Sequence, residues 1–154
     1  MSECIFCKIV KGEIPCHKIW EDEKHIAFLS PFPNTEGFTV LATKEHLQSY
    51  VFDLPEDQLK ELIVAAKKVV KKIDAGFEDV GRTGLIGEGF GIDHCHLKLF
   101  PMHGTANMEK WKPLESGSEK NVFFEKYPGY ISSHDADKMD DEKLSKIAKK
   151  IRGE

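Results

Sequence analysis

The stretch that decides the fold is His94-Cys95-His96-Leu97-Lys98. Successive side chains of an extended strand point to opposite faces, so alternate residues share a face. Cys95 and Leu97 are predicted to face an apolar core. His94, His96 and Lys98 then share the other face. Imidazole is a competent nucleophile near neutral pH and lysine carries a positive charge, so this face is suited to holding a phosphate and attacking it.

Length and composition bound the class of protein. A chain of 154 residues suits one domain, and this one is 40% hydrophobic and 31% charged with a net charge of −4. It lacks the basic excess typical of nonspecific nucleic-acid binding, and no apolar run reaches the roughly 20 residues that span a bilayer. The first residues do not resemble a secretory signal. We therefore expect a cytoplasmic protein with no nucleic-acid or membrane partner.

The remaining periodicity predicts helices and further strands. Residues 53–73 have the spacing of one buried stripe, with Asp53 and Glu56 as a capping pair and Pro55 in the first turn. The stripe comprises Leu59, Leu62, Ile63, Ala66, Val69, Val70 and Ile73. Strands are predicted at 17–20, 25–29, 38–42, 84–86 and 94–100, and a second helix at 140–152. Hairpin-connected strands with one long helix inserted favour an α+β domain with an antiparallel sheet.

Cys4 and Cys7 form a CxxC pair, for which three interpretations stay open. A cytoplasmic protein keeps its thiols reduced, which leaves redox chemistry, half of a metal site, or simple packing. A thioredoxin-like motif needs a preceding strand, which the position of Cys4 does not provide. A metal site needs two more ligands, and histidines must supply them because no second CxxC exists. Among the seven histidines, His46 and His94 each lie at an end of a predicted strand.

Two segments flank the histidine strand. Gly87-Glu88-Gly89-Phe90-Gly91 precedes it, and its glycines allow backbone amides to approach a phosphate. The segment fits neither the P-loop nor the dinucleotide fingerprint, so a turn between strands is the simpler interpretation. His103 follows the strand and can curl back beside His96, which makes it a candidate catalytic residue.

Several segments resemble the histidine triad (HIT) family. They are residues 4–15, Trp20-Glu21-Asp22-Glu23, Ala27-Phe28-Leu29 and the stretch 37–46. The histidine strand occupies the place of the family's His-x-His-x-His motif, and Pro101 closes it. The resemblance covers most of the first 103 residues. It implies a single HIT-like α+β domain over residues 1–154, with a core of about 1–103 and an irregular extension and helix at 104–154. It also implies a homodimer that joins two sheets into one.

The resemblance implies a function as well. In HIT proteins the middle histidine attacks the α-phosphorus of a nucleoside phosphate, giving a nucleotidyl-histidine that water resolves, and this role falls on His96. It implies a nucleotide phosphohydrolase or nucleotidyl transferase for phosphoramidates or dinucleoside polyphosphates, with Lys98 and His103 assisting. One ring nitrogen of His96 is then expected to lie open toward the phosphorus. The implied nucleotide-binding residues are Phe28, Ser30, Gly89, His96 and Lys98. The implied ligands of a structural Zn²⁺ are Cys4, Cys7, His46 and His94.

Four positions depart from the family's pattern. They are Lys98 for the third histidine, Ser30 for a ribose-binding aspartate, Phe38 for a histidine, and Gly87 for an asparagine. These departures leave a second hypothesis open, a zinc-stabilised module that binds a nucleotide with little or no turnover. A third hypothesis is a redox protein that uses Cys4 and Cys7.

Overall fold

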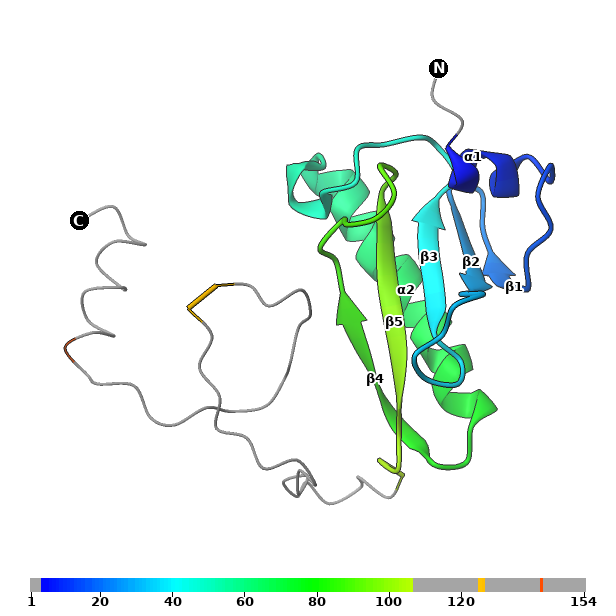
Figure 1. Cartoon of the computed structure of the whole chain (residues 1–154), viewed down its shortest axis with the longest axis vertical. Coiled ribbons are helices and arrows are strands. Elements are labelled where there is room, and N and C mark those ends of the chain that lie inside the picture. The colour runs from blue at the N-terminus through cyan, green and yellow to red at the C-terminus, as the bar shows by residue number, and fades with distance from the viewer. Residues whose placement is uncertain (1–3, 107–124, 127–141, 143–154) are drawn as a thin grey trace. The chain divides into compact units, whose positions relative to one another are not determined.

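The computed structural model describes residues 4–106, 125–126 and 142 (Figure 1). Its elements in chain order are α1 (Ile5–Val10), β1 (Lys18–Glu21), β2 (His25–Leu29), β3 (Thr39–Thr43), the 3-10 helix η1 (Val51–Asp53), α2 (Glu56–Gly76), β4 (Val80–Ile86) and β5 (His96–His103). The strands form one five-stranded sheet in the order β1-β2-β3-β5-β4. Every neighbouring pair is antiparallel. The predicted α+β class with an antiparallel sheet is confirmed.

The sheet topology places β5 between two partners. β1, β2 and β3 follow one another as hairpins, and α2 then carries the chain to β4. β5 pairs with β4 on one side and with β3 on the other, where His96 lies opposite Ala42 and Lys98 opposite Val40. Lys98 is thus held on both sides, opposite Val40 of β3 and Ile86 of β4, whereas His96 pairs with β3 alone.

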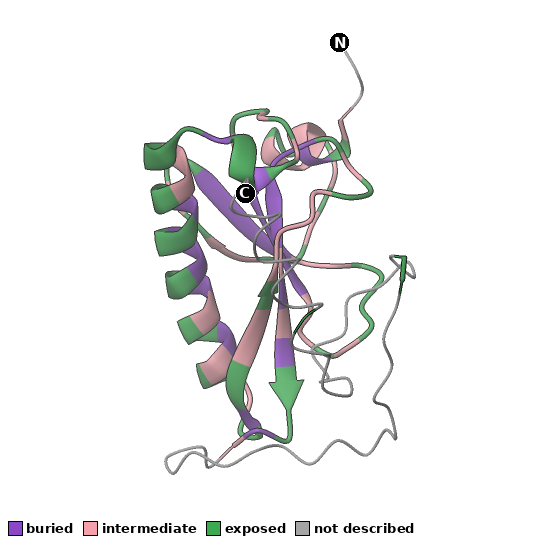
Figure 2. Ribbon diagram, turned by 90° about the vertical axis from the view of Figure 1, so that its left-hand side faces the viewer, coloured by how far each residue is buried: buried purple, intermediate pink, exposed green. Residues whose placement is uncertain are grey.

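The long helix α2 covers one face of the sheet. Figure 2 shows its buried side against the strands and its exposed side turned outward. Cys95, Leu97 and Leu99 are at most 1% exposed and share a core cluster with residues of α2. Burying a leucine side chain stabilises the fold by about 1.5–3 kcal/mol. The alternation predicted for this stretch is therefore confirmed on its apolar side.

The opposite face of the sheet has its own apolar cluster, which α1 covers in part. Phe6 of α1 packs there with Phe28 of β2, Ala42 of β3 and neighbouring residues. The ring of Phe6 meets that of Phe28 edge to face at 5.5 Å between centroids. Because His96 lies opposite Ala42 in the register, this is also the face toward which His96 points.

The start of α2 differs from the prediction. Asp53 lies in η1 rather than at the helix cap, and no side chain forms a capping hydrogen bond. Pro55 has an extended ψ of 142° and stands before the helix, which begins at Glu56. Ile63 is 46% exposed whereas Ala65 is buried. The buried side of α2 follows Leu62, Ala65, Ala66, Val69 and Ile73.

The histidine strand also begins later than predicted. β5 spans His96–His103 rather than 94–100, and β4 spans Val80–Ile86 rather than 84–86. The backbone N–H of Cys95 donates to the carbonyl oxygen of Leu47 at 2.9 Å, outside the ladder between β3 and β5. His94 therefore sits in a loop before the strand, which frees its side chain to turn toward α1.

The predictions for the C-terminal part lie largely outside the described residues. The second helix at 140–152 and most of the irregular extension that begins at residue 104 fall there. The chain divides into two units, 1–111 and 112–154, and the first contains every element named above. The single domain over 1–154 stays a prediction. Within the described part, no helix is long and apolar enough to cross a membrane.

Candidate metal centre and nucleotide site

Two cysteines and two histidines from separate segments meet at one end of the sheet. Cys4 and Cys7 stand one turn apart at the start of α1, His46 follows β3, and His94 precedes β5. Sγ of Cys4 lies 3.4 Å from Nδ1 of His94, and Sγ of Cys7 lies 3.3 Å from Nδ1 of His46 and 3.6 Å from Nδ1 of His94. All four potential ligand atoms lie within 4.8 Å of one another. This cluster is suited to holding one metal ion.

His94 is oriented for this purpose by a residue that the sequence analysis missed. Nε2 of His94 donates to the carbonyl oxygen of Thr43 at 2.7 Å, so Nδ1 keeps its lone pair and faces the sulfurs. Metal-bound histidines are commonly fixed in this way through their second nitrogen. Burial lowers the pKa of His94, which favours the neutral ring that a ligand requires. The acceptor of this hydrogen bond is a backbone carbonyl, so no side-chain motif in the sequence could have predicted the bond.

His96 is held beside the cluster, and it is more covered than expected. The residue is 3% exposed, and its ring meets that of Phe6 edge to face with centroids 5.3 Å apart. Nδ1 donates to the carbonyl oxygen of His94 at 2.7 Å, which leaves Nε2 as the atom with a free lone pair. Burial lowers the pKa of His96. The ring as a whole is therefore largely covered, and the expectation of one ring nitrogen open toward a phosphorus stays a prediction.

The second ring nitrogen of His96 is the one that the proposed reaction would use. In the described part of the chain, the one fully covered side-chain nitrogen or oxygen without a hydrogen-bond partner is Oε2 of Glu88. Nε2 of His96 has no partner among the same residues, and it is not in that fully covered class. Nε2 thus belongs to no hydrogen bond within the described residues, and His96 is not one of the four residues of the metal cluster.

Lys98 is not the free cation that its place on the strand suggested. Its ammonium forms an ion pair with Oε1 of Glu88, and the two side chains are 26% and 17% exposed. Glu88 was not predicted as a site residue, because residues 87–91 were interpreted through their glycines, as a turn or as a segment that approaches a phosphate. The available signal was a single carboxylate between two glycines, directly before the histidine stretch.

The glycines of this turn have a packing explanation. Gly89 has a φ of +71°, and a Cβ there would lie 2.7 Å from the carbonyl oxygen of Ser49. A side chain at Gly87 would meet Leu97 at 2.9 Å. The turn is therefore held closely against the segment around residue 49, which agrees with its interpretation as a connection between strands.

The other candidate nucleotide-binding residues are engaged in structural contacts. Phe28 is 2% exposed and packs against Phe6. The hydroxyl of Ser30 accepts a hydrogen bond from the backbone N–H of Phe32 at 3.2 Å. Phe38, where the family often has a histidine, stacks on Phe100 with centroids 4.4 Å apart. Phe28 supports the ring that covers His96 rather than presenting a face of its own.

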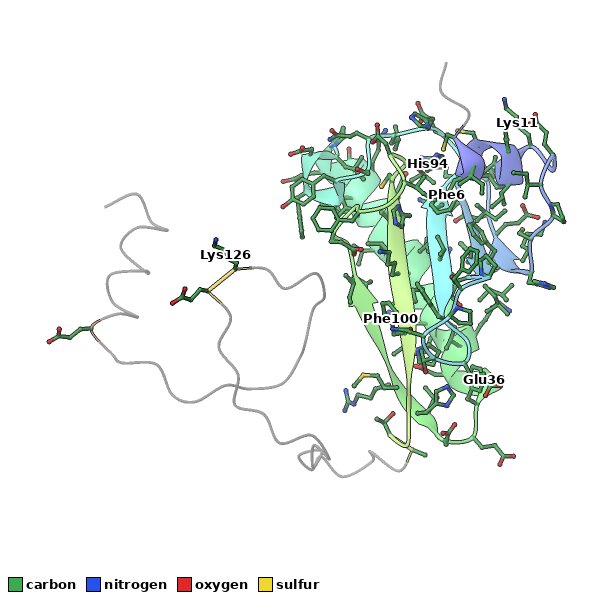
Figure 3. The ribbon with its side chains drawn as sticks, in the orientation of Figure 1. Phe6, Lys11, Glu36, His94, Phe100 and Lys126 are labelled. Carbon is green, nitrogen blue, oxygen red and sulfur yellow. The ribbon has the colours of Figure 1, made fainter. Side chains whose placement is uncertain are left out.

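The predicted return of His103 to His96 is wrong. The two residues are the ends of β5, and a rise of about 3.3 Å per residue separates them by about 23 Å. Nδ1 of His103 lies 3.1 Å from both carboxylate oxygens of Asp79, and Nε2 donates to the carbonyl oxygen of Glu36 at 2.9 Å. Figure 3 shows Glu36 far from His94. β5 continues straight through Pro101, so His103 stays at the other end of the sheet.

We instead expect His103 to make a contribution to stability that depends on pH. Both ring nitrogens face acceptors, so only the protonated ring makes both hydrogen bonds. The bond to Glu36 and the carboxylate of Asp79 raise the pKa of His103, and His103 lowers the pKa of Asp79. The contribution is present above the unfolded pKa of aspartate, about 3.9, and below that of histidine, about 6.5. It is lost as the pH rises through the raised pKa of His103.

We expect His103→Gln to lower the free energy of unfolding at pH 5.5 and to change it much less at pH 8.5. Urea unfolding of both proteins at each pH measures the difference. His17→Gln, at an exposed histidine, is the matched control and is expected to have the same small effect at both values. An equal loss at pH 5.5 and 8.5 for His103→Gln would show that the imidazolium is not what the site stabilises.

The antiparallel sheet, the cysteine–histidine cluster and the adjacent histidine strand define a class of small α+β domains. The HIT domain family model matches residues 11–105, and the chain belongs to the HIT family. An uncharacterised HIT-like protein of Methanocaldococcus jannaschii is 35% identical over 124 residues, which cover 77% of this chain and 91% of that protein. The crystal structure of a HIT family member from Bacillus subtilis covers 99% of this chain and 96% of its own, with a TM-score of 0.68 and 27% identity.

Some relatives have a named activity. The adenosine 5'-monophosphoramidase of Schizosaccharomyces pombe is 35% identical over 99 residues, covering 64% of this chain and 73% of that enzyme. The adenosine 5'-monophosphoramidase of Candida albicans is 33% identical over 114 residues, covering 68% of this chain and 74% of that enzyme. Nucleotide hydrolysis is therefore an activity found among members of the family.

Proposed function

We propose that this chain is a zinc-stabilised nucleotide hydrolase or nucleotidyl transferase that works through a nucleotidyl intermediate on His96. Its substrates would be nucleoside phosphates of the phosphoramidate or dinucleoside polyphosphate type. The observation that carries the proposal is the hydrogen bond from Nδ1 of His96 to the carbonyl oxygen of His94, at 2.7 Å. This bond selects the tautomer whose Nε2 lone pair is free to attack. The relatives named adenosine 5'-monophosphoramidase support the same substrate type.

The proposed reaction has two halves. Nε2 of His96 attacks the α-phosphorus, the bond to the leaving group breaks, and its electron pair goes with the leaving group. Water then attacks the phosphorus, and the electron pair of the phosphorus–nitrogen bond returns to Nε2. Holding the ring by one hydrogen bond and the edge of Phe6 keeps the nucleophile in position at little entropic cost.

We propose that Lys98 donates to a phosphate oxygen with the hydrogens that its contact with Glu88 leaves free. Ser30 and Gly89 are proposed to contact the nucleotide from the two loops beside this face. Phe28 is assigned a supporting part, beneath Phe6. His103 is excluded from the reaction by its place at the far end of β5.

We propose Zn²⁺ as the ion of the cluster. Tetrahedral bonds of about 2.3 Å to sulfur and 2.0–2.1 Å to nitrogen place ligand atoms about 3.3–3.8 Å apart. The three sulfur–nitrogen distances between the cysteines and histidines, 3.3–3.6 Å, fit this geometry. Four protein ligands leave no position for a substrate, so the ion would stabilise the fold rather than supply chemistry. Cys4 and Cys7 of α1 and His94 before β5 would thereby be joined, which fixes Phe6 over His96.

We also propose that the chain forms a homodimer with a continuous sheet. β4 is at an edge of the sheet, where backbone N–H and C=O groups are open to a further strand. Leu85 of β4 and Met102 of β5 are 45% and 37% exposed. A second copy adding at β4 would cover them. Light scattering that gives the mass of a monomer at micromolar concentration would contradict this arrangement.

A substrate panel on the purified protein tests the proposed function. We expect release of AMP from adenosine 5'-monophosphoramidate or from a diadenosine polyphosphate, together with about one zinc per chain by elemental analysis. Folded, zinc-loaded protein that releases AMP from neither substrate would overturn the enzymatic proposal. A reversible Cys4–Cys7 disulfide in protein without bound metal would instead favour the redox hypothesis.

One observation favours a second candidate, a nucleotide-binding module with little turnover. His96 is 3% exposed and Lys98 is already paired with Glu88, so both proposed catalytic groups are restrained. This candidate predicts nucleotide affinity that His96→Ala leaves unchanged, with no hydrolysis by the parent protein. The substrate panel separates the two, because the enzymatic proposal also expects His96→Ala to change nucleotide affinity little.

A further inference from the structure

The ion pair of Glu88 and Lys98 stands next to the proposed nucleophile. His96 and Lys98 are alternate residues of β5, so their side chains share a face with α-carbons about 7 Å apart. Glu88 comes from the loop between β4 and β5, and its Oε1 contacts the ammonium of Lys98. Neither residue is more than 26% exposed by its side chain. The pair is therefore a fixed feature of the site and not a passing surface contact.

The pair changes the charge that a substrate meets. A lone lysine beside His96 would favour an anionic leaving group, because its positive charge would stabilise the negative charge that develops on a departing phosphate. With Glu88 in contact, the two charges cancel at short range. Oε2 of Glu88 is fully covered and has no hydrogen-bond partner in the described part of the chain, so Lys98 is the one cation of that part that bonds this carboxylate. Unit charges a few ångströms apart still interact appreciably in such half-buried surroundings.

We propose that the Glu88–Lys98 pair sets leaving-group specificity at His96, favouring nucleotidyl donors whose leaving group is an uncharged amine over donors whose leaving group is an anionic phosphate. The inference rests on the proposed function and narrows its substrate class. With a phosphoramidate, Nε2 forms a bond to phosphorus as the phosphorus–nitrogen bond breaks. The leaving nitrogen keeps the electron pair and takes a proton from solvent, so it departs as a neutral amine and carries no negative charge past Glu88. The water that attacks the phosphorus in the second half returns a proton to solvent.

The test compares two substrates that transfer the same AMP. The measured quantity is the ratio of kcat/KM for adenosine 5'-monophosphoramidate to kcat/KM for diadenosine tetraphosphate. We expect Glu88→Gln to lower this ratio about tenfold and Lys98→Gln to raise it about tenfold, because the first leaves a net positive and the second a net negative charge. The double variant Glu88→Gln/Lys98→Gln restores neutrality, so its ratio is expected to return toward that of the parent.

The opposite shifts of the ratio in the two single variants, and its return in the double variant, distinguish an effect of charge from an effect of damage to the fold. Glu61→Gln is the matched control, since Glu61 pairs with Lys24 at 2.7 Å on the α2 side of the sheet, and its ratio is expected to stay that of the parent. Both single variants shifting the ratio in the same direction, or neither shifting it, would overturn the inference while turnover by the parent upholds the proposed function. A parent protein that turns over neither substrate would overturn both.

Discussion

His96→Ala is expected to lower turnover of a nucleoside phosphoramidate by at least about a thousandfold, because the group that forms the covalent intermediate is gone. Nucleotide affinity should change little, since the substitution removes no charge from the site. Stability should fall by about 1 kcal/mol from the lost hydrogen bond to the carbonyl of His94, plus the lost packing against Phe6. Steady-state kinetics, calorimetry and thermal melting of the same preparation give the three quantities.

The matched control is His17→Ala, which removes the same ring from an exposed position outside the site. Its turnover is expected to equal that of the parent. If His96→Ala retained a tenth or more of the parent activity with its zinc content intact, another group would have to be the nucleophile, and the two-step reaction would be wrong.

Cys7→Ala, or removal of the metal by a strong chelator, is expected to lower the melting temperature by about 10 °C or more. The cluster joins α1 to the segments beside β3 and β5, so its loss frees α1 and with it Phe6. Phe6 contacts the rings of both Phe28 and His96. Turnover should therefore fall together with stability.

Differential scanning calorimetry with and without chelator measures the shift, and added zinc should reverse it in the parent protein but not in Cys7→Ala. Cys16→Ala is the matched control, because Cys16 lies outside the four-residue cluster. It should keep about one zinc per chain. An unchanged melting temperature for Cys7→Ala would mean that the cluster does not tie α1 to the sheet.

Local patterns were enough to predict the fold. The period-two alternation in the histidine stretch gave the correct core-facing side, because Cys95, Leu97 and Leu99 all pack under α2. The helical spacing located α2 to within a few residues. The predicted capping pair was wrong because Asp53 lies in η1. The predicted burial of Ile63 was wrong because the buried stripe of α2 is narrower than the run of apolar residues.

The candidate site was predicted from the sequence only in part. The four residues that converge in the cluster were foreseeable, since the resemblance to HIT proteins places each of them by a local motif. The pairing of Lys98 with Glu88 was not, because a ten-residue separation in sequence says nothing about a contact made by a folded loop. His103 failed for a related reason: whether a chain turns back after a strand depends on tertiary partners, here Asp79 and Glu36.

Trapping the intermediate on His96 tests the proposed reaction most directly. The protein is mixed with adenosine 5'-monophosphoramidate, quenched at alkaline pH within a single turnover, and analysed by intact and peptide mass spectrometry. We expect a mass increase of one AMP less one water, located on His96 and absent from His96→Ala. Turnover with no adduct at any time, or with the nucleotide on a different residue, would contradict it.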